Sequence, residues 1–234
     1  MSVRVAVLAS GGGSNLQAIL DYLDARAAGA DIRVELVASD RVAAGALERA
    51  RARGIATLHL DADRRGDAMA ELLQSHAIEM IALAGYLRFV PVAVTRQWRG
   101  RILNVHPSLL PAFGGAGMYG LRVHQAVLEA GVRITGATVH FVDEEYDRGP
   151  IIAQWPVPVL PHDTAETLAR RVLGAEHALF PRIVHGVAEG RITLGADGRV
   201  AGVGEALSAC STFALLHTDG QPKVADIFAN ERSP

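Results

Sequence analysis

The sequence predicts an α/β fold built on a doubly wound, mostly parallel β-sheet. First, short runs rich in β-branched residues alternate with amphipathic, helix-like stretches through the first hundred residues. Second, these runs are continuously apolar, as in strands whose two faces are both covered by helices. Third, a glycine-rich turn, Gly11–Gly13, joins the first apolar run to the first amphipathic stretch.

The first hundred residues alternate strand and helix patterns without interruption. The first strand is expected at Val3–Ala9, and the stretch after the glycines has the period of a helix. The helix nearest residue 100 begins with a proline, which the first turn of a helix tolerates. In chain order we expect strands at 3–9, 32–39, 55–60, 80–85 and 101–106, and helices at 15–29, 43–54, 64–76 and 91–98.

The pattern changes after Pro107. The next residues are rich in glycine and proline and predict a loop. A long helix is predicted from Thr164 to about residue 190, with Asp163 or Thr164 as its N-cap and Glu166 close to the capping-box position. In chain order we expect a loop at 107–120, a helix at 121–131, and strands at 133–142 and 151–159.

The end of the chain divides into two parts. An Asp-Gly pair at 197–198, set between alternating residues, predicts a hairpin over 191–203. Residues after 203 show no clear period. We therefore expect one domain over residues 1–203 with a C-terminal hairpin, followed by a tail of unknown role over 204–234.

Composition limits the classes of function. Half of the 234 residues are apolar, enough for a sizeable core, and a net charge of −2 argues against a nucleic-acid partner. Cys210 and Lys223 are the single cysteine and lysine. They exclude an internal disulfide, a Cys-x-x-Cys site and a Walker A loop, and they disfavour Schiff-base chemistry.

Hydropathy gives no sign of a membrane segment. No apolar run reaches the roughly 18 residues of a membrane span. The run Val5–Ala9 is too short for the core of a signal sequence and leads into glycines. We expect a cytoplasmic protein with no membrane partner.

The turn after the first strand is a candidate anion site. Glycines let the backbone approach a ligand closely. The N–H groups of Gly13, Ser14 and Asn15 would point out of a helix N-terminus, where the helix dipole favours a phosphate. The plain alternative is a tight strand–helix turn with Ser14 as N-cap.

Two other readings of the same turn fit less well. A dinucleotide fingerprint needs a third glycine where Leu16 stands, although Asp40, at the end of the second strand, could hold a ribose. A nicotinamide-dependent oxidoreductase therefore stays open as an alternative. A nucleophile elbow also fails, because Leu16 replaces its final glycine.

A polar pair ends the fifth predicted strand. Asn104 and His106 are two residues apart, so their side chains share one face at the carboxyl end of a strand, where open α/β sheets bind ligands. An amide donor beside an imidazole can stabilise an oxyanion and move a proton. Burying a lone amide in an apolar strand is costly, which favours a functional role.

An acidic run follows at residues 143–147. A solvated loop is its ordinary interpretation, but Asp147 precedes Arg148-Gly149-Pro150, which would turn the chain sharply. A carboxylate held there could orient His106 and favour its charged form. The nine histidines are scattered without His-x-His or His-Glu-x-x-His spacing, so we predict no metal site.

Taken in order, several motifs resemble one known family. They are the strand followed by GGGSNLQAI, then LAGYLRFV, ILNVHPSLLPAF, TGATVHFVDEEYDRGPII and AEHALFP. Over residues 3–203 the chain resembles the folate-dependent formyltransferases, and GGGSN and AEH are similar to the branch that acts on glycinamide ribonucleotide. The resemblance implies a Rossmann-like formyltransferase fold. It also implies transfer of the formyl group of 10-formyltetrahydrofolate, the co-substrate, to the amine of glycinamide ribonucleotide in de novo purine biosynthesis, with no metal.

The resemblance also assigns roles to residues. Asn104, His106 and Asp147 match the catalytic trio: His106 as proton donor, Asn104 at the oxyanion, and Asp147 raising the basicity of His106 and positioning a relay water. Gly13, Ser14 and Asn15 match the phosphate cradle, Glu176 the acid on the ribose hydroxyls, and His140 a histidine near the site. The folate pocket would take Asn104 and the segments Leu87, Arg88, Phe89, Val90 and Asp143, Glu144, Glu145, Tyr146, Asp147. Arg65, or its neighbour Arg64, would lie near the folate.

This sequence departs from the family pattern at two places. Some relatives carry Lys or Gln three residues before the acid of AEH, reaching the phosphate, and Leu173 stands there. The loop after LLPAF is longer than usual, which leaves the alignment of residues 113–124, and any role for Arg122 or His124, open.

Rival functions and partners follow from the same resemblance. A formyltetrahydrofolate hydrolase on this fold is the nearest alternative, but such enzymes commonly carry an extra N-terminal domain. An initiator-tRNA formyltransferase would want a basic extra domain. We expect small-molecule substrates, no nucleic acid, and a monomer or homodimer.

Overall fold

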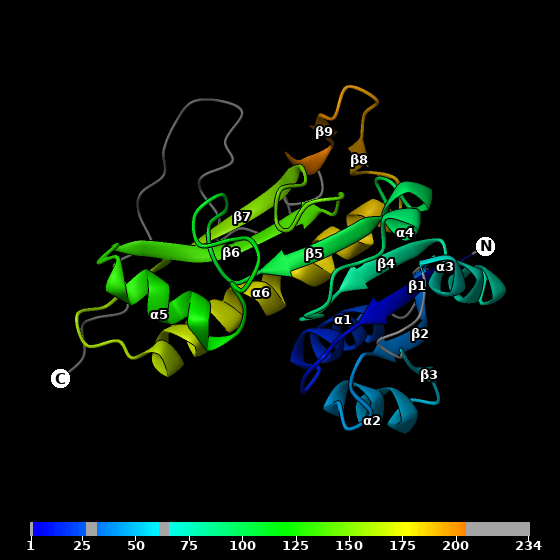
Figure 1. Ribbon diagram of the computed structural model, residues 1–234, viewed down its shortest axis with the longest axis horizontal. Helices are drawn as coiled ribbons and strands as arrows, with labels where there is room; N and C mark the ends of the chain where they lie inside the picture. Colours follow the sequence, from blue (N-terminus) through cyan, green and yellow to red (C-terminus); the bar gives the residue numbers. More distant parts are fainter. Residues whose placement is uncertain (1, 27–31, 61–65, 205–234) are drawn as a thin grey trace.

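The computed structural model describes residues 2–26, 32–60 and 66–204. Seven strands form one sheet in the order β3-β2-β1-β4-β5-β6-β7 (Figure 1). Neighbours from β3 to β5 pair in parallel, whereas β5–β6 and β6–β7 are antiparallel. The strands are β1 (Val3–Leu8), β2 (Ile32–Ser39), β3 (Ala56–His59), β4 (Met80–Leu83), β5 (Ile102–His106), β6 (Ile134–Phe141) and β7 (Ile151–Pro158). The mostly parallel α/β sheet predicted from the sequence is confirmed.

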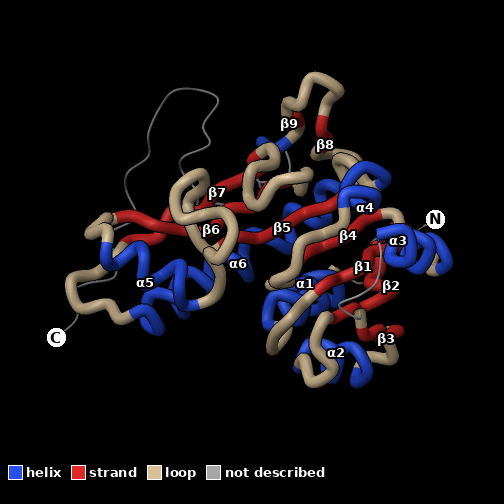
Figure 2. Tube along the Cα trace, viewed as in Figure 1, coloured by secondary structure: helices blue, strands red, loops and turns tan. Residues whose placement is uncertain are grey.

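Helices cover both faces of this sheet (Figure 2). They are α1 (Ser14–Asp24), α2 (Gly45–Ala52), α3 (Gly66–Ser75), α4 (Val92–Gln97), α5 (Leu121–Glu129) and α6 (Ala165–Ala188). Alternate residues of β1 enter different cores: Val5 and Val7 pack with residues of α1, α2 and α6, and Ala6 and Leu8 with residues of α3 and α4. Both faces of β1 are therefore buried, which is why its sequence is continuously apolar.

The helix ends agree with the sequence in part. Thr164 is the N-cap of α6, as expected, but its capping-box partner is Thr167, whose hydroxyl accepts the Thr164 backbone N–H. Glu166, the expected partner, lies one position too early. At α1 the N-cap is Gly13, with φ +76° and no side-chain cap, so the reading of Ser14 as N-cap is wrong.

The C-terminal hairpin is present as β8 (Thr193–Leu194) and β9 (Val200–Ala201), with Gly198 at φ +78° in the turn. The expected tail, 204–234, lies outside the described residues except for Gly204. Among the described helices, none has the length and apolar content needed to cross a bilayer.

Candidate active site

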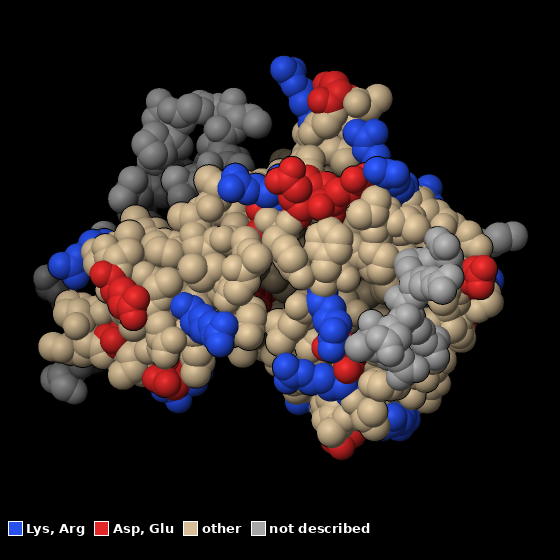
Figure 3. Space-filling view, in the orientation of Figure 1, with Lys and Arg blue, Asp and Glu red and all other residues tan. Residues whose placement is uncertain are grey.

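A cavity of about 630 Å³ opens at the carboxyl ends of β4 and β5. We call it the cleft. Its walls come from the segment after β4, the end of β5, residues 115–121, the β6–β7 connection and α6, with Asn15 of α1. The face drawn in Figure 3 is hollowed near its centre, with acidic side chains grouped above the hollow and basic ones at several points around it. This position is where open α/β sheets bind ligands.

His106 lies at the end of β5, 4% exposed, with both ring nitrogens engaged. Its Nδ1 is 3.5 Å from Oδ2 of Asp147. Its Nε2 is 2.9 Å from the carbonyl oxygen of Phe113. The structure thus brings together the histidine and the acid that the sequence placed 41 residues apart.

Asn104 lies on the same face of β5 and also lines the cleft. Its Nδ2 donates to Oδ1 of Asp147 over 3.3 Å and lies 3.1 Å from Nε2 of His140. The Nδ1 of His140 donates to the Phe141 carbonyl at 2.7 Å, so Nε2 of the neutral ring can accept from the amide. The predicted pair therefore faces Asp147 and a second, buried histidine.

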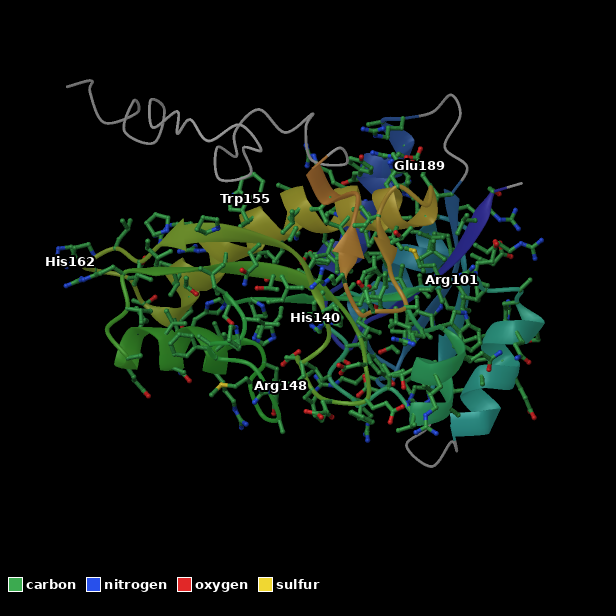
Figure 4. All side chains as sticks on the ribbon, turned by 90° about the horizontal axis from the view of Figure 1, so that it is seen from above. Arg101, His140, Arg148, Trp155, His162 and Glu189 are labelled. Carbon is green, nitrogen blue, oxygen red and sulfur yellow. The ribbon has the colours of Figure 1, made fainter. Side chains whose placement is uncertain are left out.

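The backbone around Asp147 is specialised to aim its carboxylate. Asp147 has φ +54°, a left-handed value that is uncommon outside glycine. A Cβ at Gly149 would fall 1.9 Å from the Phe141 carbonyl oxygen, so glycine is required there. The sharp turn expected from Arg148-Gly149-Pro150 is thereby explained. In Figure 4, His140 lies over the strands near the middle of the molecule, whereas Arg148 lies toward its edge.

The pKa values of His106 and Asp147 are both lowered from their ordinary values. Burial lowers the pKa of His106, and the nearby charge of Asp147 opposes this without overcoming it. As expected, the charge of Asp147 alone acts to raise the pKa of His106, but burial lowers that pKa by more. Burial would raise the pKa of Asp147; contacts with His140, His106 and the Gly115 N–H outweigh it, so its pKa is lowered.

The glycine turn brings α1 against α6. At Gly13 a Cβ would lie 2.6 Å from Cα of Ala46, so the close approach of α2 requires glycine there. Nδ2 of Asn15 donates to Oε2 of Glu176 at 2.6 Å, and burial raises the pKa of Glu176 to about 7. Asn15 and Glu176 both line the cleft, whereas Gly13 and Ser14 are not among its lining residues.

The two segments expected around a folate also meet at the cleft. Leu87–Val90 line one side, and Asp143, Glu145, Tyr146 and Asp147 line the other. The rings of Phe89 and Tyr146 pack edge to face, with centroids 5.1 Å apart. Glu144 instead turns outward and pairs with Arg96 at 2.7 Å, away from the lining. Arg65 and Arg64 lie outside the described residues.

Asp40 is engaged inside the protein. Its Oδ1 accepts from the Ser10 hydroxyl at 2.5 Å and its Oδ2 from Nε of Arg88 at 3.2 Å. The same hydroxyl accepts the Leu87 backbone N–H at 2.9 Å. Both carboxylate oxygens are thus used, which weighs against the ribose-binding role that supported an oxidoreductase.

Sequence reasoning missed several residues at the cleft. Residues 115–121 form much of one wall, and His124, whose role stayed open in the sequence analysis, lines the cleft from α5. Phe113 and Gly115 contact His106 and Asp147 through backbone groups. Every residue carries such groups, so the sequence could not indicate these contacts. Leu173 lines the cleft one turn before Glu176, as its position implied. Within ranges 2–26, 32–60 and 66–204, no three His, Cys, Asp or Glu side chains are grouped as metal ligands.

Comparison with known proteins agrees with this geometry. Residues 3–184 match the model of the formyl transferase family. The chain is 42% identical over 202 residues to the chloroplastic phosphoribosylglycinamide formyltransferase of Arabidopsis thaliana, covering 83% of this chain and 68% of that protein. It is 42% identical to the trifunctional purine biosynthetic protein adenosine-3 of Bos taurus, of which it spans only 20% while 86% of this chain is covered.

The fold is also similar to solved structures. Glycinamide ribonucleotide transformylase 1 of Symbiobacterium toebii superposes with a TM-score of 0.77 at 44% identity, covering 86% of this chain and 93% of that one.

Proposed function

The chain belongs to the formyl transferase family, and on that premise we propose that it transfers a formyl group from 10-formyltetrahydrofolate to the amine of glycinamide ribonucleotide. The product would be formylglycinamide ribonucleotide, an intermediate of de novo purine biosynthesis. The observation that carries this proposal is the group formed by Asn104, His106 and Asp147 on one wall of the cleft, with Asn15 and Glu176 on another.

The chemistry is a direct exchange of two C–N bonds. The amine nitrogen of the ribonucleotide bonds to the formyl carbon while the carbonyl electron pair moves to oxygen. The tetrahedral centre then collapses and its bond to N10 of the folate breaks. The amine loses one proton and N10 gains one, so the reaction needs a proton acceptor and a proton donor, with no change of oxidation state.

The residues at the end of β5 suit these steps. His106 donates a proton, and Asp147 orients the imidazole and positions the water that relays protons. Both N–H groups of the Asn104 amide face partners, His140 at 3.1 Å and Asp147 at 3.3 Å. In the reaction we expect the amide to exchange its longer contact, with Asp147, for a hydrogen bond to the oxyanion of the tetrahedral centre. A single oxyanion donor of this kind is typically worth about 10²–10³ in rate.

The opposite wall suits the ribonucleotide. The N-terminus of α1 favours an anion, and the Gly13 to Asn15 turn offers backbone N–H groups for its phosphate. Glu176, fixed by Asn15, accepts from the ribose hydroxyls. The folate would lie between Leu87–Val90 and Tyr146, whose apolar surfaces suit a pterin. A cytoplasmic location and a monomeric or dimeric state remain predictions from the sequence.

A two-substrate assay tests this function. We expect purified protein to convert glycinamide ribonucleotide and 10-formyltetrahydrofolate to tetrahydrofolate and the formylated ribonucleotide. A Glu144→Gln variant, whose side chain turns outward from the cleft, controls for loss of one acid from the loop that carries Asp147. No formyl transfer by the wild-type protein would reject the proposal. Release of formate without the ribonucleotide would instead identify a hydrolase.

A further inference from the structure

Three consecutive loop residues contact both members of the His106–Asp147 pair. The carbonyl oxygen of Phe113 lies 2.9 Å from Nε2 of His106, and the N–H of Gly115 donates to Oδ2 of Asp147 at 2.9 Å. Gly114, between them, packs against Asp147: a Cβ there would lie 3.2 Å from its Cβ. Phe113 ends the LLPAF motif that resembles the family, and Gly114 and Gly115 begin the loop that is longer than usual.

The Phe113 contact decides where the imidazole carries its permanent proton. A backbone carbonyl can only accept, so Nε2 must hold a hydrogen to bond with it. In the neutral ring, Nδ1 then carries the lone pair and faces Oδ2 of Asp147 at 3.5 Å. Protonation places the second hydrogen on Nδ1, opposite the carboxylate. The exchangeable proton is therefore on Nδ1.

We propose that Phe113, Gly114 and Gly115 are positioning residues that commit Nε2 of His106 to a backbone carbonyl, so that the proton used in catalysis moves at Nδ1. The catalytic use of this proton rests on the proposed formyl transfer. The tautomer itself does not, because the carbonyl and the carboxylate face the ring whether or not substrate is bound.

The backbone path of this loop is unusual in a way that fits such a role. Phe113 has φ +56° and Gly115 has φ +99°, both in the left-handed region. A side chain as large as phenylalanine seldom occupies that region without support from its surroundings. The buried Ser108 hydroxyl supports the loop by donating a hydrogen bond to the Ala112 carbonyl at 2.7 Å. The result turns a carbonyl and then an N–H toward the same pair.

Other titratable groups face His106 and contribute to its protonation. Asp147, from the β6–β7 connection, favours the charged ring, whereas His140 of β6 opposes it. His124 of α5 lines the same cleft, and burial lowers its pKa first, with His106 adding to the effect. The acceptors that face the His106 ring are the Phe113 carbonyl, 2.9 Å from Nε2, and Oδ2 of Asp147, 3.5 Å from Nδ1. Because the carbonyl lies at normal hydrogen-bond distance and the carboxylate lies farther away, the neutral ring keeps its hydrogen on Nε2.

Nitrogen NMR of the imidazole tests the tautomer directly. Protein labelled with ¹⁵N-histidine is studied without substrate at pH 8, where His106, whose pKa is lowered, is neutral. The His106 signals are identified by their loss in His106→Asn. We expect a protonated Nε2 and an unprotonated Nδ1, with Nδ1 changing as pH falls. The opposite tautomer, or rapid exchange between both, would overturn the proposal whatever the enzyme's activity.

A pH–rate profile tests the positioning role. In Gly114→Ala the new Cβ would lie 2.4 Å from Cδ2 of Leu110 and 3.2 Å from Cβ of Asp147, so we expect the loop to shift relative to His106 and Asp147. Losing the Gly115 N–H raises the pKa of Asp147, and losing the Phe113 carbonyl lowers that of His106. The pH range of full activity should therefore narrow, because its acidic limit, set by Asp147, rises and its basic limit, set by His106, falls. We expect kcat to fall about 10- to 100-fold.

Two further variants keep this test decisive. Ser108→Ala removes the hydroxyl that holds Ala112 without adding atoms, and we expect a milder narrowing of the same kind. Gly174→Ala, in open space on α6, is the matched control and should leave the profile unchanged. Lower kcat with both limbs of the profile unmoved would mean that the loop only encloses the cleft.

Discussion

At the scale of single residues, Asp147 joins more of the site than any sequence pattern indicated. It faces His106, accepts from Asn104 and Gly115, and lies 3.6 Å from Nε2 of His140. Asp147→Asn keeps the shape and removes the charge. We expect kcat to fall about 10²–10⁴-fold, the usual worth of general acid–base assistance, with the fold intact by circular dichroism. Turnover near the wild-type rate would remove Asp147 from the mechanism.

Leu173 stands where the family resemblance leads us to expect Lys or Gln in some relatives. It lines the cleft one turn before Glu176 without offering a charge to a phosphate. Leu173→Lys should tighten binding of glycinamide ribonucleotide about two- to fivefold, the gain expected from one solvated ion pair. Isothermal titration without folate measures this, with Leu173→Met as the uncharged control. Weaker binding by a folded Lys variant would show that the phosphate lies elsewhere.

At the scale of elements, Asp40 ties together the ends of three strands. Through Ser10 and Arg88 it connects β1, β2 and the segment after β4. The proposed phosphate turn and one wall of the proposed folate pocket therefore share a support. Asp40→Asn keeps one oxygen that can accept from Ser10 but removes the charge that pairs with Arg88. We expect KM for 10-formyltetrahydrofolate to rise about fivefold, since the Arg88 end is exposed. KM for the ribonucleotide and kcat should change little.

The control for that variant is another acid–arginine pair. Asp163, paired with Arg171 at the start of α6, is not among the residues that line the cleft, so Asp163→Asn should affect thermal stability and neither KM. Equal increases of both KM values in Asp40→Asn would mean that the strand ends move as a whole, without selective support of the folate segment.

At the scale of the whole molecule, the sequence predicted the features that depend on the periodicity of a single strand or helix. The bounds of β2 could be predicted to the residue, and the shared face of Asn104 and His106 follows from the two-residue repeat of a strand. Contacts between distant segments could not be predicted. Asp40 meets Ser10 and Arg88 across 30 and 48 residues, and the backbone of Phe113 and Gly115 acts through groups that every residue carries.

The buried Glu176 makes the stability of the whole fold depend on pH. Burial raises its pKa to about 7 from the 4.5 of an exposed glutamate, so the folded state binds this proton more tightly than the unfolded chain. This contribution is fully present below pH 4.5 and is lost as pH rises through 7. The difference amounts to about 3 kcal/mol.

Glu176→Gln removes this dependence while keeping an oxygen that can accept from Nδ2 of Asn15. Its new amide can also donate to Oδ1 of Asn15, which is buried without a partner among the described residues. We expect the variant to unfold about 5–10 °C above the wild type at pH 8 and near it at pH 4.5, by calorimetry. Exposed Glu129→Gln controls for the loss of a surface charge. A higher unfolding temperature for the wild type than for Glu176→Gln at pH 8 would mean that more than the hydrogen bond from Asn15 stabilises the Glu176 carboxylate.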